Sequence, residues 1–319
     1  MIDIIRTESS PLKGMNISFS DYVAQKARED SAHMTGGIPD YAFALDYELR
    51  EKLNKIPHFN SLCKKIMATV ETRETQYFNQ TALAAGPYQY PEIYEMGLDC
   101  AKRLGIGVPN IFVYNNTVMN ASTYASDITS PMIILNSGIV ERMTPGELKC
   151  VIAHECGHIH NQHCVYKGVI NTILSSGTGV LGTVLSYANI ALMQFWTRAC
   201  EITADRAALI CCDDVRDAVN VQAKLLSGGL LGGSMKDQEI NIDAFRDQLE
   251  KTFSNPARLY EILSDHPSSI RRIFASKEFE ECETFYRWRP EMKKPGGIMR
   301  SKEETDDRCR KLVNIVNNK

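Results

Sequence analysis

In Ala153-His154-Glu155-Cys156-Gly157-His158, two histidines stand four residues apart inside a segment with a helical pattern. Residues with this spacing lie on one face of an α-helix, one turn apart, so His154 and His158 can bind a single ion. Tetrahedral zinc accepts imidazole nitrogens at about 2.0–2.1 Å. Glu155 follows the first histidine, where its carboxylate can reach a zinc-activated water without binding the metal. The stretch therefore predicts zinc-dependent hydrolysis of a peptide bond.

The residues before the motif predict where its helix begins. Thr144 suits the N-cap and Pro145 the first helical position, and Glu147 completes a capping box. An apolar helical face follows, formed by Leu148, Val151, Ile152 and Ile159. The motif is thus expected in the third turn of a helix with a well-defined start.

Catalytic zinc needs a third protein ligand and one open position for water. The alanine-rich segment 198–208 contains neither Gly nor Pro and predicts a second helix, on which Glu201 and Asp205 share one face. Taken alone, such a pair also fits an ordinary solvated acidic face, but together with the two histidines it favours a metal site. Glu201 is the predicted third ligand, and Asp205 is predicted to accept a hydrogen bond from a ligand histidine and to orient it. The expected cofactor is one Zn²⁺ per chain, with Glu155 as general base.

H-E-x-x-H followed by E-x-x-x-D on a second helix resembles the gluzincin metallopeptidases, and the flanking residues are similar to the HtpX and CAAX prenyl protease family. Asn120-Ala121-Ser122 resembles the Asn-Ala edge strand of that family, and residues 137–148 resemble the segment that leads into its active-site helix. His266-Pro267, followed by Arg272-Ile273, matches its His-Pro motif with the trailing arginine. The resemblance covers roughly residues 90–275.

The resemblance implies a zincin-like peptidase core, an α+β fold that is mostly α, with a short mixed sheet and an active-site helix. It implies that His266 donates a hydrogen bond to the oxyanion that develops on the substrate carbonyl, with Arg272 positioning it or sharing the charge. It also implies that residues 119–122 form an edge strand that binds an extended peptide by β-augmentation, with Asn120, Ala121 and Ser122 as the substrate-binding residues. For His266, a structural histidine before a helix is the alternative.

Relatives of this kind usually carry transmembrane helices, and the uncharged segment 168–196 is the one candidate for a span. Because His158 precedes it and Glu201 follows it, a single crossing would place ligands of one zinc on opposite sides of a bilayer. Two crossings would need about 40 residues, more than the segment offers. We therefore expect a helical hairpin or paired helices packed on the core, and contact with a membrane surface stays an alternative.

The chain divides into three expected parts: a helical N-terminal extension (1–88), a zincin-like peptidase domain (89–282) and a C-terminal tail (283–319). Gly and Pro near residue 87 mark the first boundary. Either the N-terminal extension or the C-terminal tail is a candidate for occluding the zinc site at rest. In the tail, Trp288 and Tyr286 are the candidate side chains for blocking the site. The alternative is that both segments simply pack on the core.

Composition narrows the function classes. The net charge of −3 is spread without long blocks, which argues against a nucleic-acid partner. Ten cysteines without a signal peptide indicate reduced thiols and a cytoplasmic protein, and Cys156, Cys211 and Cys212 are expected to be buried. His160 and His163, which follow the motif, are expected to turn away from the metal into solvent. The predicted function is a zinc metalloendopeptidase acting on peptides or unfolded proteins, and the alternatives are a catalytically silent zinc scaffold and a membrane-attached protease.

Overall fold

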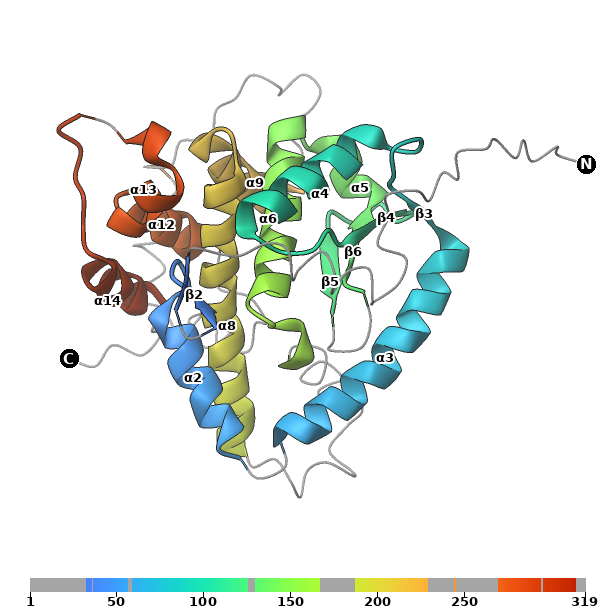
Figure 1. The fold of residues 1–319 in the computed structure, drawn as a ribbon, viewed down its shortest axis with the longest axis horizontal. Coiled ribbons are helices and arrows are strands. Elements are labelled where there is room, and N and C mark those ends of the chain that lie inside the picture. Colours follow the sequence, from blue (N-terminus) through green and yellow to red (C-terminus); the bar gives the residue numbers. More distant parts are fainter. Residues whose placement is uncertain are drawn as a thin grey trace, which may run out of the picture.

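A computed structural model describes residues 33–35, 37–56, 59–125, 130–166, 187–228, 244, 269–293 and 295–313. The α-helices of this part are α2 (Ala44–Asn54), α3 (Phe59–Thr81), α4 (Pro91–Leu104), α5 (Ser137–Arg142), α6 (Pro145–His160), α8 (Tyr187–Cys211), α9 (Val215–Ser227), α12 (Ser269–Glu280), α13 (Glu283–Trp288) and α14 (Lys302–Val313). The strands are β1 (Met34–Thr35), β2 (Ile38–Pro39), β3 (Ala82–Ala84), β4 (Asn110–Tyr114), β5 (Ala121–Tyr124) and β6 (Met132–Asn136). Helices dominate and the strands are short, so the predicted α+β, mostly α fold class is confirmed (Figure 1).

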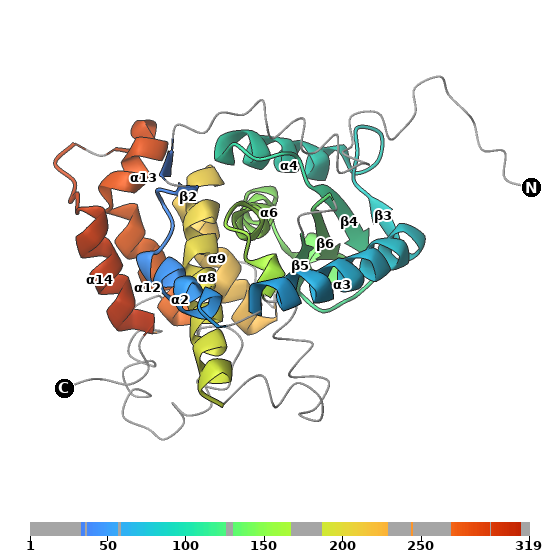
Figure 2. The same ribbon diagram turned by 60° about the horizontal axis from the view of Figure 1, so that its bottom comes forward.

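A four-stranded mixed sheet has the order β3-β4-β6-β5. β6 pairs parallel with β4 and antiparallel with β5, where Ser122 lies opposite Ile134. Every residue of β6 is buried because helices cover both faces of the sheet. Ile133 belongs to the large core shared with α4 and α6, whereas Ile134 packs with Phe78 of α3 (Figure 2). β5 is an edge strand, since no described strand pairs with its outer side.

The helix that carries both motif histidines begins as predicted. The Thr144 hydroxyl accepts a hydrogen bond from the Glu147 backbone N–H at 3.3 Å, and the Glu147 carboxylate accepts one from the Thr144 N–H at 2.8 Å. Pro145 is the first residue of α6, so the capping box is confirmed. The Lys224 ammonium of α9 reaches the same carboxylate at 2.6 Å. This end of α6 is therefore tied to a neighbouring helix.

α6 and α8 pack against each other at unusually small residues. A Cβ atom added to Gly157 would lie 2.7 Å from the Ala207 Cβ and 3.0 Å from the Ala204 Cα. Only a glycine with alanines opposite it permits this approach, because real Cβ contacts are longer. The alanine-rich character of the second helix is thus what brings it close to the first.

The segments on either side of the predicted peptidase domain share its core. Leu45 and Leu49 of α2 belong to one apolar cluster with Trp196 of α8. β3, which lies in the N-terminal extension, pairs antiparallel with β4. The Arg206 guanidinium of α8 forms a buried ion pair with Asp306 of α14 at 2.7 Å. The extension contributes β3 to the four-stranded sheet, together with α2 and α3, and the tail contributes α13 and α14.

Two other predictions concern cysteines and the apolar segment. All ten cysteines lie in the described part of the chain and are free thiols, as expected, and all of them are buried, including Cys156, Cys211 and Cys212. Residues 167–186, which form most of the predicted hairpin, lie outside the described residues, and α8 begins at Tyr187. Among the described helices, none combines the length and apolar character needed to cross a membrane.

Candidate metal site and cleft

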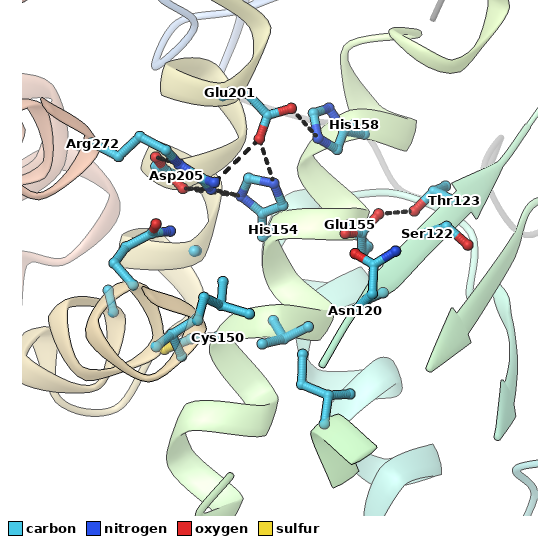
Figure 3. Close-up of a pocket in the computed structure, with 18 of the residues that line it drawn as sticks. Asn120, Ser122, Thr123, Cys150, His154, Glu155, His158, Glu201, Asp205 and Arg272 are labelled. Atoms are coloured by element: carbon cyan, nitrogen blue, oxygen red, sulfur yellow. Dashed lines mark hydrogen bonds and ion pairs between the residues drawn. The ribbon is translucent and has the colours of Figure 1, made fainter. Parts of the chain in front are cut away.

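α6 and α8 bring three metal-binding side chains together. The His154 Nε2 atom lies 3.4 Å from one carboxylate oxygen of Glu201, and the His158 Nε2 atom lies 3.5 Å from the other (Figure 3). One ligand atom from each of the three residues falls within 4.8 Å of the others. The sequence-predicted ligands therefore surround a common point.

The donor set and its spacing fit zinc. Two ligand atoms bound to a tetrahedral ion at about 2.0–2.1 Å stand about 3.3 Å apart. The two nitrogen–oxygen distances, 3.4 and 3.5 Å, are close to that value. Imidazole nitrogen and carboxylate oxygen are also the donors that catalytic zinc sites use. The three side chains thus form a donor set that can hold zinc.

Asp205 and Arg272 lie beside these ligands. The His154 Nδ1 atom is 3.0 Å from the Asp205 Oδ1 atom, so the ring presents its Nε2 atom to Glu201. The Arg272 guanidinium donates to both Asp205 oxygens, at 2.6 and 2.8 Å, and pairs with Glu201 at 3.4 Å. Arg272 therefore holds two carboxylates that belong to the same helix. Asp205 and Arg272 are both buried.

These contacts shift the pKa values of the site. Burial acts to lower the pKa of the His154 ring, but hydrogen bonds to Asp205 and Glu201 raise it to about 9. Burial acts to raise the pKa of Asp205, yet the Arg272 guanidinium and His154 bring it below its usual value. At neutral pH Asp205 is therefore a carboxylate, and a metal ion that binds His154 has to displace a proton.

Glu155 faces the edge strand. The Thr123 hydroxyl of β5 donates a short hydrogen bond to the Glu155 Oε2 atom. Asn120, Ala121 and Ser122, the predicted substrate strand, line the same cleft as the metal ligands. The predicted substrate-binding residues ended at Ser122 and did not include Thr123, which is the next residue of the same strand. β5 therefore supplies one wall of the cleft and a partner for the predicted base.

The cleft has a volume of about 460 Å³. Its other walls come from α9, through Val221 and Leu225, from α3, through Met67 and Val70, and from α5 and α12. Within the described part of the N-terminal extension, α3 is the element that lines the cleft. Neither Trp288 nor any other residue of the described tail lines it.

The prediction for His163 is wrong. Its side chain is fully buried, and its Nδ1 atom lies 2.8 Å from the Nδ1 atom of His158. The physical reason is that α6 ends at His160, and Gln162 adopts a left-handed backbone conformation with φ 58°. The chain folds back at this point, so helical spacing no longer says where a side chain points. His160 is half-buried and its ring contacts the Tyr41 hydroxyl at 3.0 Å.

His266, the predicted oxyanion donor, lies outside the described residues. Arg272, its predicted companion, is described and lies against Asp205 and Glu201.

Comparisons with known proteins agree on a peptidase family. The family model described as "Peptidase family M48" matches residues 87–280. The "Plastoglobule-localized metallopeptidase 48, chloroplastic" of Arabidopsis thaliana is 29% identical over 228 residues, which cover 69% of this chain and 65% of that protein. A "Protease HtpX homolog" of Sulfurihydrogenibium sp. is 35% identical over 83 residues, which cover 26% of this chain and 28% of that protein. The chain thus spans less than two thirds of the length of these curated relatives.

Among solved structures, the crystal structure of S. mikatae Ste24p is similar with a TM-score of 0.38 and 18% sequence identity. The match covers 73% of this chain and 62% of that chain.

Proposed function

The chain belongs to peptidase family M48, and we propose that it is a zinc metalloendopeptidase that hydrolyses peptide bonds in peptides or unfolded proteins. The observation that carries the proposal is the convergence of His154, His158 and Glu201 on one point in a cleft that also contains Glu155. These three residues would hold one zinc ion per chain. The cleft is bounded by an edge strand, which suits an extended peptide.

In this proposal Glu155 carries the proton transfers. Zinc, when bound, supplies Lewis acidity that polarises the substrate carbonyl and lowers the pKa of a water molecule. Glu155 accepts the proton of the attacking water and later donates it to the leaving amine. The hydrogen bond from Thr123 holds one oxygen of the Glu155 carboxylate and fixes its orientation. His266 is the proposed donor to the oxyanion.

Asp205 and Arg272 act as positioning residues. Asp205 accepts from the His154 Nδ1 atom, which leaves the Nε2 atom of the ring available for metal. Arg272 neutralises Asp205 and contacts Glu201, so two carboxylates can lie close together at low exposure. Arg272 is also placed to share negative charge that develops during hydrolysis.

The substrate is proposed to add a strand to β5. The Asn136 backbone N–H donates to the Asn120 carbonyl at 3.1 Å, so residue 120 directs its backbone groups toward β6. In an antiparallel pair this direction alternates, so the N–H and C=O groups of Ala121 and Thr123 point to the free edge. A peptide bound there would pair through its main chain, which favours broad sequence tolerance, while Asn120 and Ser122 line the cleft beside it.

Access to the cleft is proposed to be restricted by the N-terminal extension and not by the tail. Met67 and Val70 of α3 line the cleft. Trp288 of the tail instead donates to Asp40 at 2.6 Å and stacks on His33 with ring centroids 4.0 Å apart. α3 is therefore the candidate element for self-inhibition. Buried free thiols are compatible with a reducing compartment such as the cytoplasm.

The test compares wild type with Glu155→Gln, using atomic emission for zinc and a quenched generic peptide for cleavage. The amide is nearly isosteric and cannot take the proton, so we expect bound zinc to be unchanged and cleavage to fall by about 10²–10⁴-fold. Glu92→Gln, in the exposed first turn of α4, is the matched control and should behave as wild type. Cleavage by Glu155→Gln near the wild-type rate would move the base elsewhere. A zinc-loaded wild type that cleaves nothing would favour the silent scaffold.

A further inference from the structure

A buried chain of hydrogen bonds links α2 to the metal site. The His158 Nδ1 atom lies 2.8 Å from the His163 Nδ1 atom, and the His163 Nε2 atom lies 2.8 Å from the Asp46 Oδ2 atom. Asp46 also accepts from the Trp196 Nε1–H at 2.9 Å and from the Thr203 hydroxyl at 2.8 Å. Asp46 and His163 are 0% exposed and His158 is 4% exposed. Hydrogen-bonded groups this far from water constrain one another strongly.

The chemistry of the donors gives this chain a direction. An ionised carboxylate only accepts hydrogen bonds, so the hydrogen between Asp46 and His163 sits on the His163 Nε2 atom. When the His158 Nε2 atom binds a metal, the hydrogen of that ring sits on its Nδ1 atom, so the His163 Nδ1 atom accepts. The His158 Nδ1 atom then has to donate, and the His158 Nε2 atom keeps its lone pair toward Glu201. The opposite direction would place a hydrogen on the His158 Nε2 atom, where it blocks a metal.

We propose that Asp46 and His163 are positioning residues that hold His158 in the tautomer and orientation needed to bind the metal. The inference rests on the proposed zinc site and adds to it two residues that neither touch the metal nor lie in the H-E-x-x-H motif. Asp46 comes from α2, outside residues 87–280 that match the family. The N-terminal extension thereby completes the metal site at its buried end.

The alternative interpretation of this region is a second, separate metal site. Asp46, His163 and Cys200 have ligand atoms within 4.8 Å of one another. However, the Asp46 oxygens already accept from the indole, the hydroxyl and the His163 ring, and both His163 nitrogens are engaged. A metal there would have to break these bonds, so the positioning role is favoured.

The test measures the zinc dissociation constant of the full-length chain by chelator competition, together with the visible spectrum of the cobalt-substituted protein. In His163→Asn, the amide oxygen stands where the Nδ1 atom was and can still accept from His158. In His163→Gln, the amide reaches the Nε2 position and keeps only the Asp46 contact. We expect His163→Gln to weaken zinc binding by about 10–100-fold, as the loss of such partners does, and His163→Asn to bind several-fold more tightly than His163→Gln. The cobalt spectrum should change more in His163→Gln.

Asp46→Asn supplies an independent arm, because an amide no longer fixes the His163 tautomer, and zinc binding should weaken by about tenfold. Asp306→Asn is its matched control, since Asp306 is also a buried carboxylate and accepts from the Ala44 N–H at the start of α2. It should lower thermal stability and leave the zinc affinity of the folded protein unchanged.

A wild type without zinc would defeat the proposed site itself. The positioning role alone would be overturned by the following result: the wild type binds one zinc per chain, and both Asp46→Asn and either folded His163 variant bind zinc with wild-type affinity. Two zinc ions per chain would also overturn it.

Discussion

At the residue scale, Glu155 depends on a neighbour that lies on another element. Its carboxylate is buried on α6, and the Thr123 hydroxyl of β5 is a hydrogen-bond partner. A carboxylate that must accept a proton from water and return it to an amine needs a fixed direction, because proton transfer requires hydrogen-bond geometry. Thr123 therefore couples the proposed base to the proposed substrate strand.

Replacing Thr123 with Val removes the hydroxyl and keeps the shape of the side chain. We expect peptide cleavage to fall by about tenfold or more, with bound zinc unchanged, because the carboxylate loses its anchor and the metal ligands do not. Steady-state cleavage and metal content measure the two effects. Thr117→Val, on an exposed threonine, is the control. Equal rates in Thr123→Val and wild type would remove Thr123 from the proposed mechanism.

Residue spacing predicted the metal ligands better than it predicted the residues that position them. His154 and His158 are four apart on one helix, and Glu201 and Asp205 repeat this spacing on another, so helical geometry alone predicts two faces that meet. The structure places His154, His158 and Glu201 around one point, and Asp205 lies against the Nδ1 atom of His154. His163 lies beyond the end of its helix, where that geometry stops applying. Asp46 lies far earlier in the chain, and no local pattern relates it to the motif.

At the element scale, the site depends on the distance between α6 and α8. The two histidines belong to α6 and the carboxylate ligand belongs to α8, so any movement of the helices apart separates the ligands. Gly157 sets this distance, because its missing side chain leaves room for Ala207 and the backbone at Ala204. Position 157, one of the two variable positions of the H-E-x-x-H motif, is therefore constrained by packing in this chain.

Gly157→Ala should weaken zinc binding by about tenfold or more and lower stability by about 1–3 kcal/mol, as overpacking does. Chelator competition and thermal unfolding measure the two quantities. Adding Ala207→Gly should restore part of the zinc affinity, since it removes the closest contact at 2.7 Å. Gly97→Ala, whose new Cβ would meet the Ile111 side chain at 2.6 Å, controls for overpacking away from the site. Wild-type zinc affinity in Gly157→Ala would contradict this view of the helix pair.

Individual helices and strands were easier to predict from the sequence than the way in which they pair and pack. A capping box and an apolar face predicted α6, and apolar runs at 111–114 and 132–135 predicted β4 and β6. Their pairing is parallel, and the later strand lies between β4 and β5. Strand order depends on which faces the helices cover, and this involves contacts between distant residues that periodicity does not report.

At the scale of the whole molecule, the flanking segments are part of the site. α2 supplies Asp46 to the buried side of the metal ligands, and α3 covers one face of the sheet and lines the cleft. Arg206 and Asp306 pair α8 with α14 in the interior. The three expected parts of the chain were defined by helix-breaking residues and composition. These features mark loops well, but they do not show which helices pack together. Removing residues 1–88 would therefore take away a wall of the cleft, a strand and a buried carboxylate at once.

The central claim is that one zinc ion binds among His154, His158 and Glu201, with Glu155 beside it and not bound to it. Anomalous X-ray scattering from crystals of the zinc-loaded protein, recorded on both sides of the zinc absorption edge, tests this most directly. We expect one peak per chain, bound by the Nε2 atoms of both histidines and by the Glu201 carboxylate. A peak at Asp46, His163 and Cys200, or no peak among the three predicted ligands, would contradict the claim.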